Sequence, residues 1–305
     1  MSKRPAKNAT SKDLPTRREL VQAFLRRHSL SESVSPIAVE PAIYWTDATL
    51  LLLQFGFGGA SETLIDDPTS GLLFNMLNRN FEAVEGAIVA FLSECGPTSE
   101  LSSRAAIEFA ASIMFILRGD RRLRLLAYLD DYISAVRLQV RRWRDTIAKL
   151  PVAAQLDHTR AATQREQANE VLSGIVEQIR INFGVGSQQE VWPSVAGRFE
   201  AIGAADHYRT VYARLSSQTH SDAEETLRYF VGVISGSEEL MNNIGIETVE
   251  FTRMMLFFAV SDFAKASIAF ASVYDWSEIV PRLREALPEL DARLREVSLN
   301  IGGLQ

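Results

Sequence analysis

Cysteine is almost absent from the sequence, and this excludes several kinds of site at once. Cys95 stands alone, so neither a disulfide framework nor a thiolate metal cluster can form within one chain. None of the four histidines belongs to a Glu-x-x-His or His-Glu-x-x-His motif, and no Walker A sequence occurs. We therefore expect no metal and no cofactor. A lone cysteine also suits a reducing, cytoplasmic location.

Long apolar runs are missing as well. The longest run in the C-terminal third is Met254–Val260, and Arg253, Asp262 and Lys265 bracket it. A membrane-spanning helix needs about 20 predominantly apolar residues, so we expect no membrane association. The basic start of the chain is not followed by an apolar segment, which argues against secretion.

Strand patterns are the third absence. Alternating apolar and polar residues do not occur between turn residues, and no internal repeat is detectable. Apolar residues instead recur three and four apart, which predicts an all-α multi-helix bundle. We interpret residues 13–305 as a single all-α domain that follows a disordered basic tail, residues 1–12. Gly and Pro divide the pattern into helices over 13–28, 70–94, 98–117, 120–150, 153–183, 193–202, 205–220, 222–234, 247–273 and 276–297, with Pro288 expected to split the last.

The glycine-rich stretch 56–59 does not fit a nucleotide-binding motif. Residues 29–46 contain two prolines and are predicted to form a loop, and a leucine-rich segment then ends in Gly-Phe-Gly-Gly. These glycines do not complete G-x-G-x-x-G, because Ser61 occupies the sixth position. We interpret them as a helix C-terminus followed by a turn.

Charge is unevenly distributed along the chain. The formal net charge is −6, yet residues 1–30 carry eight Lys or Arg against Asp13 and Glu19. A basic end on an acidic body is typical of a nucleic-acid tether, of an anchor to the chain's own acidic surface, or of a solvated tail.

A second basic feature lies in the helix predicted over 120–150. Arg137, Arg141 and Arg144 share one face there. Such a strip could follow a phosphate backbone. The alternative is a solvated helix face, because acidic residues are interleaved with the arginines.

The stretch 205–224 carries the pattern least typical of a structural helix. Tyr208, Tyr212, Ser216 and His220 recur four apart and therefore share one helix face, with Arg214 alongside. A surface helix normally presents Lys and Glu in such positions, and a core-facing helix presents Leu and Ile. Hydroxyl groups and an imidazole there indicate a candidate site.

Arg104 and Glu108 form the other candidate. They lie one helical turn apart among apolar neighbours, and charges in such a segment are costly to bury unless they are paired. They either form an ion pair at the surface of their own helix or point into a cleft that faces Tyr212 and His220. The residues alone leave both possibilities open. In the second case, the two helices would pack against each other.

Three motifs together carry a family resemblance: Ser103-Arg-Ala-Ala-Ile-Glu108, Trp192-Pro-Ser-Val-Ala, and Tyr208-x3-Tyr212-x3-Ser216-x3-His220. They resemble an uncharacterised, mostly bacterial family of helical proteins, over about residues 70–275. That family is in turn similar to the HEPN superfamily, small helical bundles found in toxin and phage-defence ribonucleases. The HEPN hallmark is Arg, four to six residues, then His, which Arg214-x5-His220 fits. On a straight helix these two residues lie about 120° apart, so either that helix is distorted or Arg104 supplies the positive charge.

The resemblance implies metal-independent RNA cleavage by a homodimer. His220 would move the proton while Arg104 or Arg214 stabilises charge on the phosphate. Glu108 would orient the arginine or the histidine, and Tyr212 and Ser216 would bind a phosphate oxygen or the sugar. The alternative is a non-enzymatic scaffold or sensor in which the same polar cluster is structural and fixes helix register.

Overall fold

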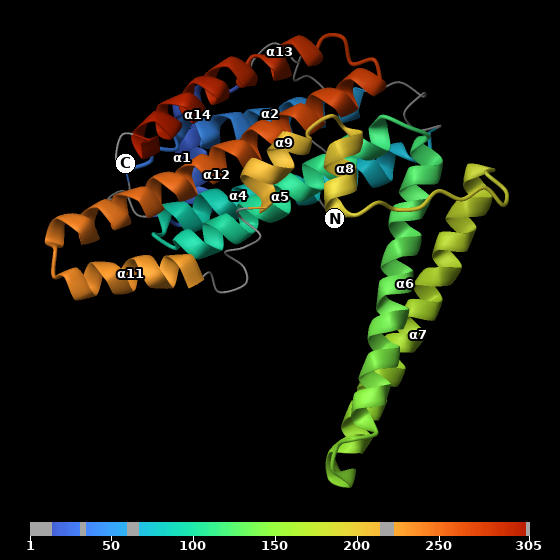
Figure 1. The fold of residues 1–305 in the computed structure, drawn as a ribbon. Helices are drawn as coiled ribbons and strands as arrows, with labels where there is room; N and C mark the ends of the chain where they lie inside the picture. Colours follow the sequence, from blue (N-terminus) through green and yellow to red (C-terminus); the bar gives the residue numbers. More distant parts are fainter. Residues whose placement is uncertain (1–13, 31–34, 60–66, 214–222, 303–305) are drawn as a thin grey trace. The chain divides into compact units, whose positions relative to one another are not determined.

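The computed structural model describes residues 14–30, 35–59, 67–213 and 223–302, and every regular element in these ranges is helical (Figure 1). The all-α prediction is therefore confirmed. The basic tail predicted for residues 1–12 lies outside the described residues. The chain groups into two compact units, one comprising Met1–Asp66, Ser70–Met114 and Val195–Gln305 and the other Asp67–Thr69 and Phe115–Ser194. That the chain forms one domain stays a prediction.

Helix α12, Glu238–Val273, forms the centre of the first unit. It packs against α2 (Glu40–Gly59), α4 (Ser70–Leu92) and α14 (Ala286–Gly302). Between Phe251 and Ala271 most positions are buried, because neighbouring helices cover α12 on several sides. The length and composition of α12 would also allow it to cross a membrane, but 72% of its most apolar window is buried inside the protein, as in a core helix.

Two predicted boundaries in this unit are wrong for local reasons. Helix α12 begins nine residues before position 247, because the Ser237 hydroxyl accepts a hydrogen bond from Leu240 N and caps the helix. Residues 40–46 belong to α2 rather than to a loop. Pro41 lies in its first turn, where proline removes no helical hydrogen bond.

The other helices of this unit are α1 (Arg17–Arg27), α5 (Gly96–Leu117, which continues into the second unit), α8 (Val195–Ala201), α9 (Ala205–His207), the π-helix η1 (Tyr208–Tyr212), α11 (Ala223–Ser235) and α13 (Val280–Arg284). The break between α13 and α14 falls at Glu285, close to Pro288, where the sequence predicts a split.

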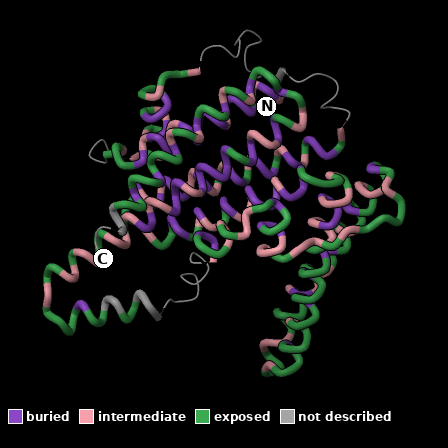
Figure 2. The backbone as a smooth tube through the Cα atoms, turned by 45° about the horizontal axis from the view of Figure 1, so that its top comes forward, coloured by how far each residue is buried: buried purple, intermediate pink, exposed green. Residues whose placement is uncertain are grey.

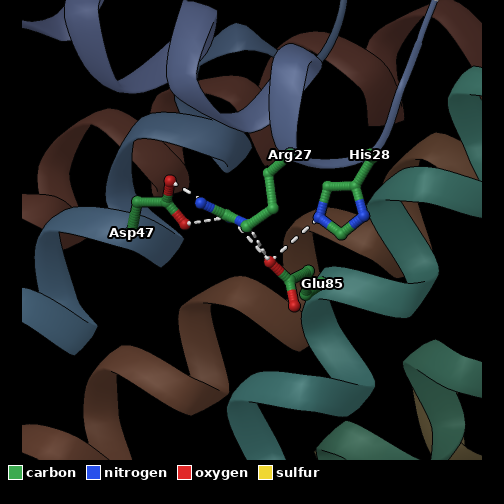
Figure 3. Close-up of polar contacts among 4 residues, drawn as sticks. All are labelled: Arg27, His28, Asp47 and Glu85. Atoms are coloured by element: carbon green, nitrogen blue, oxygen red, sulfur yellow. Dashed lines mark hydrogen bonds and ion pairs between the residues drawn. The ribbon is translucent and has the colours of Figure 1, made fainter. Parts of the chain in front are cut away.

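Helix α1 is tied to α2 and α4 by a cluster of charged side chains (Figure 3). The Nη2 atom of Arg27 lies 3.0 Å from Asp47 Oδ1 and 2.6 Å from Glu85 Oε1, and His28 Nε2 lies 3.0 Å from the same Glu85 oxygen. Burial raises the pKa of Asp47, and the hydrogen bond from Arg27 opposes that shift. Helical periodicity does not reveal the pairing of His28 with Glu85, because the two residues lie 57 positions apart. Because both carboxylates are matched by cations, we interpret this cluster as a structural tie.

The second unit is dominated by an antiparallel helical hairpin of α6, Arg121–Ile147, and α7, Val152–Phe183. The Asp120 side chain caps α6 by accepting hydrogen bonds from Arg122 N and Leu123 N. Four of the buried residues of α6, and the buried residues of α7, recur every seven positions, which is the spacing of a left-handed coiled coil. They are Leu126, Ile133, Val140 and Ile147 on α6 and Ala162, Asn169, Val176 and Phe183 on α7. Most of the remaining hairpin surface is exposed (Figure 2).

Asn169 is the one polar residue in this repeating set. It is buried, and its Nδ2 donates a hydrogen bond of 3.3 Å to the carbonyl oxygen of Ile133. A polar residue in a coiled-coil seam can specify the register of the two helices. The Oδ1 of Asn169 is buried and has no hydrogen-bond partner among the described residues, so the alignment rests on the apolar seam and on the Nδ2 contact.

Gly56 and Gly58 of α2 provide a matched test of the packing around α12 and α13. A Cβ on Gly56 would lie 2.2 Å from the Trp276 ring, whereas a Cβ on Gly58 would meet nothing within 4 Å. We expect Gly56→Ala to lower the free energy of unfolding by about 1–3 kcal/mol through overpacking. Gly58→Ala should leave stability unchanged or raise it by up to about 1 kcal/mol through helix propensity. Urea unfolding measures both, and equal stabilities would contradict the packing described here.

Candidate functional site

The carboxylate of Glu108 lies at the centre of a polar cluster in the first unit. Its Oε1 accepts a hydrogen bond of 2.8 Å from Arg198 Nη2, and its Oε2 accepts one of 2.6 Å from the Tyr212 hydroxyl. Arg104, one turn earlier on α5, lies against the same tyrosine. Its Nε is 3.4 Å from the Tyr212 oxygen, and its guanidinium carbon is 5.2 Å from the ring centroid. Helices α5 and α8 and the π-helix η1 thus meet at one carboxylate.

The members of this cluster differ sharply in exposure. The side chain of Glu108 is 39% exposed and that of Arg198 only 6%. Tyr212 is buried, and Arg104 is intermediate. The accessible part of the cluster is therefore the carboxylate of Glu108 and the guanidinium of Arg104, which share one face of α5. The buried side chains of Arg198 and Tyr212 support them.

The π-helix η1 positions Tyr212. Its first and last residues, Tyr208 and Tyr212, stack with ring centroids 5.5 Å apart, and Phe199 of α8 contacts both rings. The sequence predicts a regular α-helix over 205–220, so the π-helical turn is a correction. Such turns are rare and occur frequently at functional sites.

The electrostatics keep Tyr212 in its donor form. Burial raises the pKa of the hydroxyl, its hydrogen bond to Glu108 raises that pKa further, and Arg104 acts in the opposite direction. At neutral pH the tyrosine is therefore protonated and donates to Glu108. The cluster offers an incoming ligand a carboxylate that can accept a proton and a guanidinium that can bind a phosphate oxygen.

A second polar group anchors the segment that leads into η1. His207 Nε2 lies 2.6 Å from Asp262 Oδ2, and Lys265 Nζ lies 3.1 Å from the other oxygen of that carboxylate. Burial by itself would raise the pKa of Asp262, but the hydrogen bond and charge of His207, together with Lys265, lower it below its ordinary value. Asp262 on α12 thus holds the side chain of His207, the residue immediately before η1, in position.

Of the residues predicted from sequence, the structure brings Arg104, Glu108 and Tyr212 together. Arg214, Ser216 and His220 lie outside the described residues. Arg104 therefore contacts the cluster, and the same question for Arg214 stays open.

Sequence reasoning identified neither Arg198 nor the pairing of His207 with Asp262. The available signal for Arg198 was a charged residue between Gly197 and Phe199 in a short apolar helix. Within the described part of the chain, no group of three or more His, Cys, Asp or Glu side chains could hold a metal ion.

The lowered pKa of Asp262 predicts a loss of stability in acid. A depressed carboxyl pKa contributes stability that is present above the ordinary aspartate pKa of about 4 and is lost as the pH falls through the folded-state value. We expect Asp262→Asn to lower the free energy of unfolding at pH 7 by about 1–3 kcal/mol, because the partly exposed His207 and Lys265 lose their hydrogen bonds to a charged partner. Below pH 4 the difference from the native protein should shrink. Urea unfolding between pH 7 and pH 3 measures this, with Asp291→Asn on the exposed face of α14 as control. A difference independent of pH would contradict the assignment.

A comparison with known protein families gives one match. The model of a family of unknown function, DUF5677, matches residues 71–237. No curated protein and no solved structure matches the chain. The matched range contains Arg104, Glu108, Arg198 and Tyr212, whereas Asp262 lies beyond it. Because the match covers more than half of the sequence, the chain belongs to DUF5677, a family of unknown function.

Proposed function

We propose that this protein is an HEPN-like RNA-binding protein that cleaves RNA without a metal ion, in a bacterial stress or defence role. The observation that carries the proposal is the Glu108 carboxylate, shared between Arg198 and Tyr212 and left partly exposed beside Arg104. The exposed part of the Glu108 carboxylate is what an incoming ligand could reach. A phosphate-binding site needs both an accessible guanidinium and a second group held at a fixed distance from it.

In the proposed reaction the RNA supplies its own nucleophile. The 2′-oxygen attacks the adjacent phosphorus, an O–P bond forms, and the bond from phosphorus to the 5′-oxygen breaks. A base takes the 2′-hydroxyl proton, and the departing 5′-oxygen receives a proton. The products are a 2′,3′-cyclic phosphate and a 5′-hydroxyl.

The roles follow from chemistry and position. Arg104 donates hydrogen bonds to the phosphate oxygens as negative charge grows on them. Arg198 and Tyr212 are positioning residues, because they fix the orientation of the Glu108 carboxylate. His220 is the proposed proton-transfer group, since an imidazole titrates near neutral pH.

A non-enzymatic scaffold is the second candidate, and the burial of Arg198 and Tyr212 favours it. Buried polar networks can fix the alignment of helices without any catalysis. The two candidates differ in what the exposed members do. A scaffold uses Glu108 only as an acceptor, whereas a ribonuclease also requires Arg104 and His220.

The test is incubation of the purified protein with total RNA, with and without EDTA. We expect cleavage that EDTA does not affect and new 2′,3′-cyclic phosphate ends. Arg104→Ala should reduce the cleavage rate by about 10²-fold or more, as loss of one donor to a developing oxyanion does. Its stability should change by less than about 1 kcal/mol, because the side chain is only partly buried.

The control for Arg104→Ala is Arg79→Ala, which removes an exposed arginine that pairs with Glu82 on α4. It should cleave RNA at the native rate. His220→Ala should abolish cleavage and leave the thermal melt nearly unchanged. A native protein that neither binds nor cleaves RNA, together with a strongly destabilised His220→Ala, would support the scaffold instead.

A further inference from the structure

The half of the α6–α7 hairpin that contains its turn, residues 137–166, carries an excess of positive charge in an acidic protein. Residues 137–166 contain seven Lys or Arg and three Asp or Glu, while the whole chain has a formal net charge of −6. All seven cationic side chains are exposed: Arg137, Arg141, Arg142, Arg144, Lys149, Arg160 and Arg165. The positive charge therefore faces solvent and is not buried within the hairpin.

Few of these cations are neutralised by the protein. Arg144 pairs with Glu166, and Arg137 donates a hydrogen bond of 2.9 Å to the Ser173 hydroxyl. Within the part of the chain that the structure describes, Arg141, Arg142, Lys149 and Arg160 make no ion pair and no side-chain hydrogen bond. Like charges on successive turns of one helix repel each other. The hairpin thus carries an electrostatic cost that a polyanion would remove.

The cations are not needed to hold the two helices together. The seven-residue apolar seam already does so, and the basic residues lie outside it. Arg137, Arg141 and Arg144 occupy one flank of α6, spaced four and three residues apart. They extend over about 10 Å at a rise of 1.5 Å per residue. Cations spaced along one side of a helix can contact successive phosphates of a nucleic-acid strand.

Aromatic rings accompany this basic surface. Trp143 of α6 meets the exposed His158 of α7 edge to face, with centroids 6.2 Å apart. Aromatic side chains between cations can stack on unpaired bases. An anionic membrane is less well matched, because a helix lying on a bilayer needs a broad apolar face beside its cations. Here the seam uses the apolar faces, and Val152 and Leu156 are the strongly exposed aliphatic side chains near the turn.

We propose that residues 137–166 of the α6–α7 hairpin form an RNA-binding surface whose cations contact the phosphate backbone. The choice of RNA over other polyanions rests on the proposed function, whereas the surface itself rests on the charge and geometry of the hairpin. This surface shares no residue with the Glu108 cluster, and its proposed role is to supply affinity for the substrate.

The experiment measures binding of the full-length protein to a fluorescent RNA stem-loop by anisotropy between 50 and 200 mM salt. The variant is Arg141→Ala/Arg142→Ala/Lys149→Ala. We expect its Kd at 100 mM salt to rise at least about 10-fold, and the slope of log K against log salt to decrease by about 2–3, since each lost phosphate contact contributes about 0.9. Arg141→Lys/Arg142→Lys keeps the charge and should bind within about threefold of the native protein.

The matched control is Arg18→Ala/Arg284→Ala/Arg295→Ala, which removes the same charge from exposed positions on α1, α13 and α14. It should bind RNA nearly as the native protein does, and both triple variants should melt at the native temperature. Equal weakening by the two triple variants would overturn the inference, because net charge alone would then explain binding. Binding to vesicles of anionic lipid, with none to RNA, would also overturn it.

Failure of the proposed function gives a different result. If the native protein never cleaves RNA but binds it in a way that depends on the hairpin, the inference stands and only the cleavage is lost. If the native protein cleaves RNA while the hairpin variant binds and cleaves at the native level, the cleavage stands and the inference is overturned.

Discussion

A buried arginine is stable only when an anion neutralises its charge. In this protein, that requirement brings α5, α8 and η1 together. Arg198 is almost completely covered, and Glu108 from α5 matches its charge. The same carboxylate then accepts the Tyr212 hydroxyl and draws η1 onto α5. Removing Glu108 would leave the buried Arg198 and Tyr212 without this partner, which is expensive in a low-dielectric interior. The position of Arg104 against the tyrosine ring follows from this arrangement.

Much of the fold could be predicted because its determinants are local. Apolar residues three and four apart identify helices, and Gly or Pro marks most of their ends. The errors arise where one signal has two meanings. Pro41 is typical of a loop in the sequence pattern, but proline is also common in the first turn of a helix, where the structure places it. The early start of α12 depends on one serine cap, Ser237, in a segment whose apolar pattern is weak.

The candidate site was predictable only in part, because its partners are distant in sequence. Arg104, Glu108 and Tyr212 were identifiable from polar groups on otherwise apolar or aromatic faces. Arg198 contacts Glu108 across 90 positions, and His207 contacts Asp262 across 55. No periodicity within one helix reveals such pairs. The π-helical turn is likewise invisible to a search for a 3.6-residue repeat, because its residues depart from that spacing.

The seven-residue spacing of the hairpin was present in the sequence, and it limits how this element can change length. Adding or removing one or two residues in α6 would rotate the arginines beyond that point onto another face and take the seam residues out of alignment. A matched step of seven residues in both helices, about 10 Å along the axis, preserves the seam and the direction of every side chain. The hairpin can therefore change in length by whole heptads while its basic residues keep the same positions relative to the seam.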